Sequence, residues 1–305
     1  MADYGFTMAA HEVTAGGALN HGRVATTEGA ATAIAATRRP AMSQMTTRRK
    51  LAIATWAAPR EGLIYGKLTL DAGPVLAYIE RVRAATGEKV TVTHVVGKAV
   101  AVALARAPGL NGRILFGAFH PYPSVDVSFL VALEEGGDLG KAKIADADKK
   151  SCATIAAELR GRAGKLHRKE DADFEKSKGV IRLLPTFLLR LLLSVVGWLG
   201  GALGVAIPAL GVERFPFGSC VITSVGMFGL DEGFAPHTPF ARVPLLVLVG
   251  AIRDRPAVED GEIVVRSELT VTATIDHRFI DGFQGGVLAK TVRELFAEPE
   301  KLDLG

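Results

Sequence analysis

The chain has 305 residues, enough for one large domain or two ordinary ones, and 49% of them are hydrophobic, so a substantial core can form. The formal net charge of +4 is modest, and the one basic cluster, between residues 38 and 50, has no interleaved aromatic residues, which argues against nucleic-acid binding. The 2 cysteines are too few for a disulfide framework or a zinc site, so we expect a reducing compartment and no metal centre.

Residues 1–45 are rich in Ala, Gly and Thr and show no sustained hydrophobic periodicity, which predicts a flexible arm rather than a domain. No charged segment followed by an apolar run opens the chain, so no secretory signal is predicted and a cytoplasmic location is expected. The remainder, 46–305, is expected to form one domain that is interrupted by an insertion at about 169–214.

Strands and helices alternate in the first half of this domain. Leu63–Leu70 is predicted to be a strand, and Asp71 is expected to cap a helix that ends at Gly87. Apolar residues spaced three and four apart over 95–104 predict a buried helix, and those that alternate over 125–133 predict a half-buried strand. This order predicts an α/β sandwich with a mixed sheet and packed helices.

The most informative pattern surrounds His277. Alternating apolar residues and threonines over 269–275 predict a strand with one apolar face, and apolar residues at helical spacing over 287–296 predict an amphipathic helix. His277 therefore lies where a strand ends and a turn begins, with Asp281 and Gly282 shortly after it. An imidazole titrates near neutrality, so a histidine oriented at this junction can act as a general base. The alternative is a strand-end histidine that makes a structural hydrogen bond.

Four stretches in the second half of the chain follow one another in a characteristic order: Phe217–Gly229, Val249–Pro256, Gly261–Arg266 and Asp276–Gly282. Together they resemble the catalytic domain of dihydrolipoamide acyltransferases, the core subunits of 2-oxoacid dehydrogenase complexes, which share a fold with chloramphenicol acetyltransferase. Thr47–Ala54 resembles the opening helix of that family, and 145–151 resembles the start of a later helix. The resemblance implies a chloramphenicol acetyltransferase-like fold, a trimeric assembly and acyltransferase activity.

By this resemblance, His277 is the base that activates the attacking thiol. Aligning the Gly-Met-Phe-Gly turn places Thr223 where the family has the serine that stabilises the oxyanion, and Ser224 is the second choice. Asp281 is expected to pair with Arg49 of the opening helix and to hold the histidine turn. From the residues alone, Thr223 indicates an ordinary strand threonine and Asp281 a turn residue, and both alternatives stay open.

The resemblance also implies coenzyme A as the acyl substrate, bound in a channel between the subunits of a homotrimer or larger homo-oligomer. The sequence shows no lipoyl-lysine hairpin, so the lipoyl group is not expected on this chain, and lipoyl-bearing or dehydrogenase subunits are expected to act in trans. The resulting prediction is a coenzyme A-dependent acyltransferase that moves an acyl group between thiols. The rival prediction is a non-catalytic or weakly catalytic scaffold of a 2-oxoacid dehydrogenase-like complex.

The insertion at about 169–214 departs from the family, which has only a short connector there. Leu191–Val212 carries no charge and is long enough, on length alone, to span a membrane. One crossing would place the two halves of the fold on opposite sides of a bilayer, and charged residues, prolines and glycines interrupt a second crossing. We therefore expect an apolar helical flap over 180–212 that contacts another subunit or a hydrophobic partner, or lies at a membrane surface. Protein contact is favoured.

Overall fold

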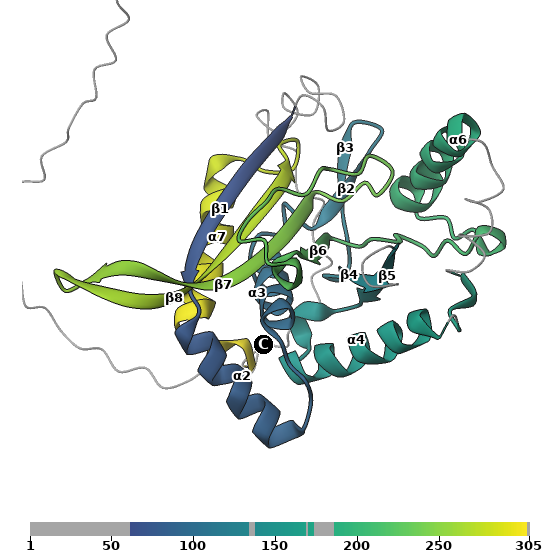
Figure 1. Cartoon of the computed structure of the whole chain (residues 1–305). Coiled ribbons are helices and arrows are strands. Elements are labelled where there is room, and N and C mark those ends of the chain that lie inside the picture. Colours follow the sequence, from purple (N-terminus) through teal and green to yellow (C-terminus); the bar gives the residue numbers. More distant parts are fainter. Residues whose placement is uncertain (1–61, 134–137, 169, 174–185, 304–305) are drawn as a thin grey trace, which may run out of the picture. The chain divides into compact units, whose positions relative to one another are not determined.

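The computed structural model describes residues 62–133, 138–168, 170–173 and 186–303, so the predicted arm and opening helix lie outside the described residues. Within this part, six strands form one sheet in the order β1-β8-β7-β6-β4-β5 (Figure 1). Neighbours β4 and β6, and β6 and β7, run parallel, whereas the other pairs are antiparallel, which confirms the mixed sheet. The strands are β1 Leu63–Asp71, β4 Val127–Leu133, β5 Asp138–Ile144, β6 Cys220–Ser224, β7 Leu245–Glu259 and β8 Glu262–Asp276.

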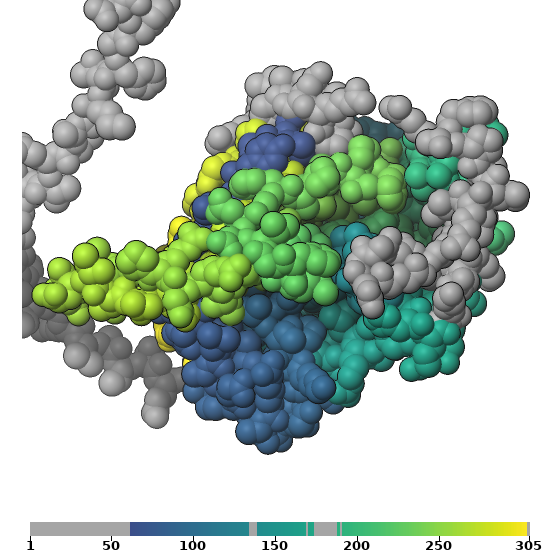
Figure 2. Space-filling model, in the orientation of Figure 1, coloured from purple at the N-terminus to yellow at the C-terminus, as the bar shows by residue number. Residues whose placement is uncertain are grey.

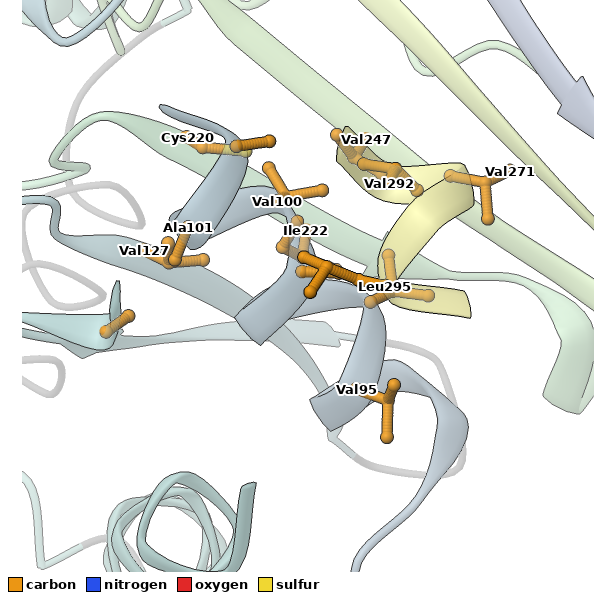
Figure 3. Close-up of a cluster of buried hydrophobic side chains, with 14 of the residues drawn as sticks. Val95, Val100, Ala101, Val127, Cys220, Ile222, Val247, Val271, Val292 and Leu295 are labelled. Carbon is orange, nitrogen blue, oxygen red and sulfur yellow. The ribbon is translucent and has the colours of Figure 1, made fainter. Parts of the chain in front are cut away.

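Four helices share one hydrophobic core with this sheet. Val100, Ile222 and Leu295 lie together in it, contributed by a helix, a strand and a second helix (Figure 3). Each such fully buried aliphatic side chain stabilises the fold by about 1.5–3 kcal/mol. A separate hairpin pairs β2 (Gly112–Leu115) with β3 (Ala118–Pro121). The four helices are α2 Gly73–Thr86, α3 Val92–Arg106, α4 Cys152–His167 and α7 Gly282–Ala297.

The second face of the sheet is also covered. The segment that follows β6 lies over Thr272 and Thr274 of β8, which are each 1% exposed. Their hydroxyls donate to the carbonyl oxygens of Gly233 and Ala235 in that segment. Leu130 of β4 packs on this side against a small second apolar cluster. The threonine side of β8 is therefore as buried as its apolar side.

Two local predictions are wrong. The N-cap of α2 is Ala72 rather than Asp71, whose carboxylate instead accepts a hydrogen bond from the Gly73 backbone N–H at 2.8 Å. β4 does not alternate in burial: Val127, Ser128 and Phe129 are all buried, because apolar groups cover both faces of the sheet at this strand.

The described part of the insertion contains α6 (Thr186–Gly197), which continues directly into a π-helical stretch, η3 (Trp198–Leu203). A short 3-10 turn, η4 (Pro208–Leu210), follows. Among the described residues, no helix combines the length and the apolar character that a bilayer crossing requires. Within the described residues of the expected flap, the chain is helical from Thr186 to Leu203 and mostly irregular from there to Val212.

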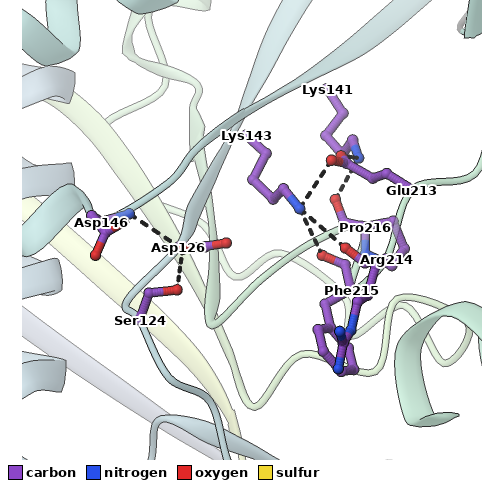
Figure 4. Close-up of polar contacts among 9 residues, drawn as sticks. All are labelled: Ser124, Asp126, Lys141, Lys143, Asp146, Glu213, Arg214, Phe215 and Pro216. Atoms are coloured by element: carbon purple, nitrogen blue, oxygen red, sulfur yellow. Dashed lines mark hydrogen bonds and ion pairs between the residues drawn. The ribbon is translucent and has the colours of Figure 1, made fainter. Parts of the chain in front are cut away.

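Ionic contacts join the end of the insertion to the edge strand β5 (Figure 4). Lys141 and Lys143 of β5 lie 2.7 Å and 3.0 Å from the two carboxylate oxygens of Glu213. Lys143 also donates to the carbonyl oxygens of Arg214 and Phe215 at 3.2 Å and 3.1 Å. Burial lowers the pKa of Lys141, while Glu213 opposes that effect. These contacts fix where the chain re-enters the sheet at β6.

The hairpin formed by β7 and β8 extends beyond its neighbours. β1 pairs with β8 only as far as Glu268, whereas β7 and β8 stay paired up to Glu259 and Glu262. The tip stands out from the body of the domain (Figure 2, yellow-green). Apolar side chains at the tip are 72% to 80% exposed: Val258, Ile263 and Val265. Exposed apolar residues on one projecting element are typical of a contact surface.

Candidate active site

His277 occupies the predicted junction between a strand and a helix, because β8 ends one residue before it and α7 begins at Gly282. Its backbone N–H donates to the carbonyl oxygen of Gly62 at 2.6 Å, which ties the turn to the start of β1. Phe279 is 4% exposed and its ring contacts the ring of Phe119 edge-on, with centroids 6.3 Å apart. The hydrogen bond to Gly62 and the ring contact of Phe279, neither of which the sequence indicated, fix the backbone that carries the imidazole.

The imidazole of His277 has a defined orientation. Its Nδ1 lies 2.5 Å from the carbonyl oxygen of Ile280. A carbonyl oxygen can only accept a hydrogen bond, so Nδ1 carries the proton and donates it. Nε2 is then the basic nitrogen of the neutral ring, which is the arrangement that a general base requires.

Asp281 begins helix α7. Its carboxylate accepts a hydrogen bond from the backbone N–H of Gln284 at 3.0 Å, which makes Asp281 the N-cap. Such a cap contributes about 0.5–2 kcal/mol. The spacing of an acid and a glutamine three residues apart is a recognised cap signal that the sequence contained. Arg49, the expected ion-pair partner, lies outside the described residues, so that pair stays a prediction.

Charged residues on both sides of His277 form an ion pair. Nε of Arg278 lies 2.9 Å and 3.0 Å from the two carboxylate oxygens of Asp276, and its Nη2 lies 2.5 Å from one of them. Asp276 is 2% exposed, so this pair is largely withdrawn from water. The sequence prediction gave neither residue a role, although an acid and a base directly before and after the histidine could have indicated an ion pair.

Thr223 and Ser224 end strand β6, where both side chains are half-buried. Neither hydroxyl has a hydrogen-bond partner among the described residues, so both can donate to a bound group. The turn that follows packs tightly on β7: a Cβ at Gly226 would lie 2.6 Å from the carbonyl oxygen of Gly250. Only glycine permits this approach, which sets the position of the two hydroxyls.

Within one chain, His277 and Thr223 lie far apart. Thr223 is in register with Leu248 of β7, which is in register with Thr272 of β8, and His277 follows five residues after Thr272. At about 3.3 Å per residue and about 4.8 Å between strands, roughly 19 Å separates the two positions. A single chain therefore does not bring the base and the candidate oxyanion donor together.

The family model for 2-oxoacid dehydrogenases acyltransferase (catalytic domain) matches residues 40–181 and 209–304. The chain belongs to this family. The resemblance drawn from the sequence is thus confirmed, and the matched family is one of acyltransferase catalytic domains. The match omits 182–208, a stretch that falls inside the expected insertion.

Curated relatives carry the same type of name. The chain is 27% identical over 220 residues to the dihydrolipoyllysine-residue acetyltransferase component of the acetoin cleaving system of Bacillus subtilis, which covers 72% of this chain and 44% of that protein. It is 33% identical over 95 residues to the Saccharomyces cerevisiae dihydrolipoyllysine-residue succinyltransferase component of the 2-oxoglutarate dehydrogenase complex, mitochondrial, covering 30% of this chain and 20% of that protein. The chain therefore spans less than half the length of these relatives.

Solved structures show the same fold. The cubic core of the pyruvate dehydrogenase multienzyme complex superposes with a TM-score of 0.58 at 19% identity, covering 86% of this chain and 90% of that one. Dihydrolipoamide acetyltransferase of Azotobacter vinelandii superposes with a TM-score of 0.57 at 19% identity, covering 79% and 83%. The α/β architecture implied by the resemblance is thereby confirmed.

Proposed function

We propose that this domain is a coenzyme A-dependent acyltransferase that moves an acyl group between thiols, with His277 as general base and Thr223 as oxyanion donor. The proposal rests on the His277 imidazole, whose Nδ1 is held by the Ile280 carbonyl at 2.5 Å so that Nε2 can take a proton. The Azotobacter vinelandii structure was determined to examine a serine, a histidine and an asparagine in the catalytic mechanism of that enzyme. Thr223, His277 and Asp281 supply a hydroxyl, an imidazole and a carboxylate here.

In the proposed reaction, Nε2 of His277 accepts the proton of the attacking thiol as its sulfur bonds to the thioester carbonyl carbon. The carbonyl oxygen becomes an oxyanion, to which the Thr223 hydroxyl donates a hydrogen bond; Ser224 is the second candidate. When the intermediate collapses, the carbon–sulfur bond of the original thioester breaks and the departing thiolate recovers the proton from His277. A general base contributes about 10²–10⁴-fold and one oxyanion donor about 10²–10³-fold.

The separation of roughly 19 Å within one chain, estimated from strand spacing, supports a site shared between neighbouring subunits. In this proposal, His277 of one subunit acts with Thr223 of the next in a homotrimer. The exposed apolar tip of the β7–β8 hairpin, with Val258, Ile263 and Val265, provides a surface for contact with another subunit. Coenzyme A and a dihydrolipoyl group carried by another chain are the proposed pair of thiols.

The proposal is tested by replacing His277 with alanine. We expect His277→Ala to lower acyl transfer from acetyl-coenzyme A to dihydrolipoamide at least about 100-fold, because the attacking thiol loses its base. His167→Ala is the matched control, since His167 is exposed at the end of α4, away from the histidine turn, and should keep wild-type turnover. Circular dichroism would establish that both variants are folded. A His277→Ala protein that turns over like the control would overturn the assignment.

A further inference from the structure

The insertion forms one wall of a cavity beside the histidine turn. The cavity has a volume of about 160 Å³, and residues of α6, η3, β2, the loop 237–243 and the turn after β8 surround it. The family match omits 182–208, so the wall made by the insertion is additional to the matched domain. The charged and polar side chains among its lining residues are Arg113, Ser194, His237, Arg242, Asp276 and Arg278.

Two glycines allow the insertion to pack closely against the loop 237–243. A Cβ at Gly197 would lie 2.4 Å from the carbonyl oxygen of Phe240, and a Cβ at Gly201 would lie 3.3 Å from side-chain carbons of Arg242. Arg242 has a φ of 54°, a left-handed conformation that costs a residue with a side chain about 1–3 kcal/mol. The close packing therefore fixes Arg242 against the insertion, at the edge of the cavity.

The guanidinium groups in the cavity are not equivalent. Arg278 is paired with Asp276, but neither Arg113 nor Arg242 has a carboxylate partner among the described residues. In the same part of the chain, Nε of Arg113 and Nε of Arg242 are buried without a hydrogen-bond partner. A buried, unsatisfied donor costs about 1–3 kcal/mol, and more when it is charged. Burial, together with the neighbouring charge of Arg278, lowers the pKa of Arg242.

His237 adds a third unsatisfied atom. Its Nε2 lies 2.7 Å from the carbonyl oxygen of Val243 and donates to it, whereas Nδ1 is buried with no partner among the described residues. Burial lowers the pKa of His237, Asp276 opposes this effect and Arg278 adds to it. The charged groups that line the cavity with His237 are the three arginines and Asp276. Proton uptake at Nδ1 would convert this atom into a further donor.

We propose that this cavity binds a small oxyanion, a carboxylate or a phosphoryl group, between Arg113, Arg242 and His237. The ligand accepts hydrogen bonds from the two guanidinium groups, which pairs charges that the protein leaves unpaired. Uptake of one proton by Nδ1 of His237 adds a third hydrogen bond, so binding strengthens as the pH falls.

Calorimetric titration of the full chain with sodium sulfate, and separately with sodium succinate, at constant ionic strength tests the proposal. Sulfate represents a phosphoryl group without titrating itself, and succinate represents a carboxylate. Arg113→Gln is expected to weaken binding at least about tenfold, as loss of a charge-assisted hydrogen bond does. Arg214→Gln is the matched control, because Arg214 contacts the same aromatic ring as Arg113 but does not line the cavity. The Cζ atom lies 4.9 Å from the centroid of the Phe215 ring in Arg214 and 4.5 Å from it in Arg113. This variant should bind like the wild type.

The pH dependence gives a second readout. The affinity of the wild type for sulfate should be higher at about pH 6 than at about pH 8. His237→Gln should remove that difference, because the glutamine side chain takes up no proton. If Arg113→Gln does not fold, Arg242→Gln replaces it in the comparison. Binding of neither anion by the wild type would overturn the proposal. So would equal weakening in Arg113→Gln and Arg214→Gln, because that result indicates screening of surface charge.

Discussion

Two histidines of this domain use Nδ1 in opposite ways, and the difference decides which of them can serve as a base. Nδ1 of His277 donates to the Ile280 carbonyl at 2.5 Å, which directs the basic lone pair to Nε2. Nδ1 of His94 accepts from the backbone N–H of Thr91 at 3.0 Å, at the start of α3. His94 therefore uses its Nδ1 lone pair to cap a helix, whereas the Nδ1 of His277 is a donor and its lone pair lies on Nε2.

His94 makes the stability of the domain depend on pH. Burial, assisted by the charge of Arg83, lowers the pKa of His94 to about 4, below the value of about 6.5 in the unfolded chain. The native state resists protonation, so its stability is full above about pH 6.5 and falls as the pH decreases towards about 4, by at most roughly 3 kcal/mol.

We expect His94→Gln to reduce this acid-induced loss, because glutamine can accept the same hydrogen bond from Thr91 without titrating. Urea unfolding of both proteins between about pH 7 and pH 4 measures the difference, in which groups common to both proteins cancel. Parallel curves for wild type and variant would show that His94 does not carry the effect.

Asp281 combines a cap with a predicted ion pair, and substitutions can separate the two. Asp281→Ala should lower the free energy of unfolding by about 1 kcal/mol or more through loss of the cap on Gln284. Asp281→Ser should restore the cap but not the charge, so its remaining deficit reports the pair with Arg49. We expect that deficit to vanish when Arg49 is already alanine, as a double-mutant cycle would measure. Additive losses would mean that the two residues do not interact.

At the scale of elements, hydrophobic periodicity predicted the strand before His277, the helix after it and the earlier alternation of strands and helices. These elements were predictable because each buries one face against the common core. The coverage of the threonine side of β8 could not be predicted in this way. Gly233 and Ala235 contribute only backbone carbonyl oxygens there, and a backbone group leaves no mark in the pattern of side chains. The anchoring of Phe279 by Phe119 was likewise set by tertiary packing, whereas the ion pair of Arg278 with Asp276 is local in sequence.

The bulge in β7 near Gly250 should be intolerant of any side chain. A Cβ there would lie 1.9 Å from the carbonyl oxygen of Asp231, so Gly250→Ala must displace backbone. We expect a loss of several kcal/mol, at the upper end of the roughly 1–3 kcal/mol typical of overpacking or beyond it. Gly286→Ala is the control within α7, where a Cβ meets open space and should stabilise the helix by about 0.5–1 kcal/mol. Chemical denaturation compares the two, and a neutral Gly250→Ala would contradict the close approach.

At the scale of the whole molecule, the described chain contains the parts of a site but not a site in which they meet. His277 and Thr223 sit roughly 19 Å apart, by strand spacing, in the same sheet. In the proposed homotrimer these residues act across a subunit boundary, which no periodicity or spacing within one chain could have shown. The arrangement leads to a test that depends only on which chain supplies which residue.

His277→Ala and Thr223→Val proteins should each be nearly inactive when prepared alone, since each lacks one half of the chemistry. Unfolded together and refolded as mixed oligomers, some interfaces would combine an intact His277 from one chain with an intact Thr223 from its neighbour. Activity should return to a sizeable fraction of wild type, because catalysis depends on geometry and not on which chain carries each group. A site built within one chain could not be rescued, because every chain still carries one lesion. Mixed oligomers, identified by mass, that stay as inactive as the separate variants would exclude the shared site.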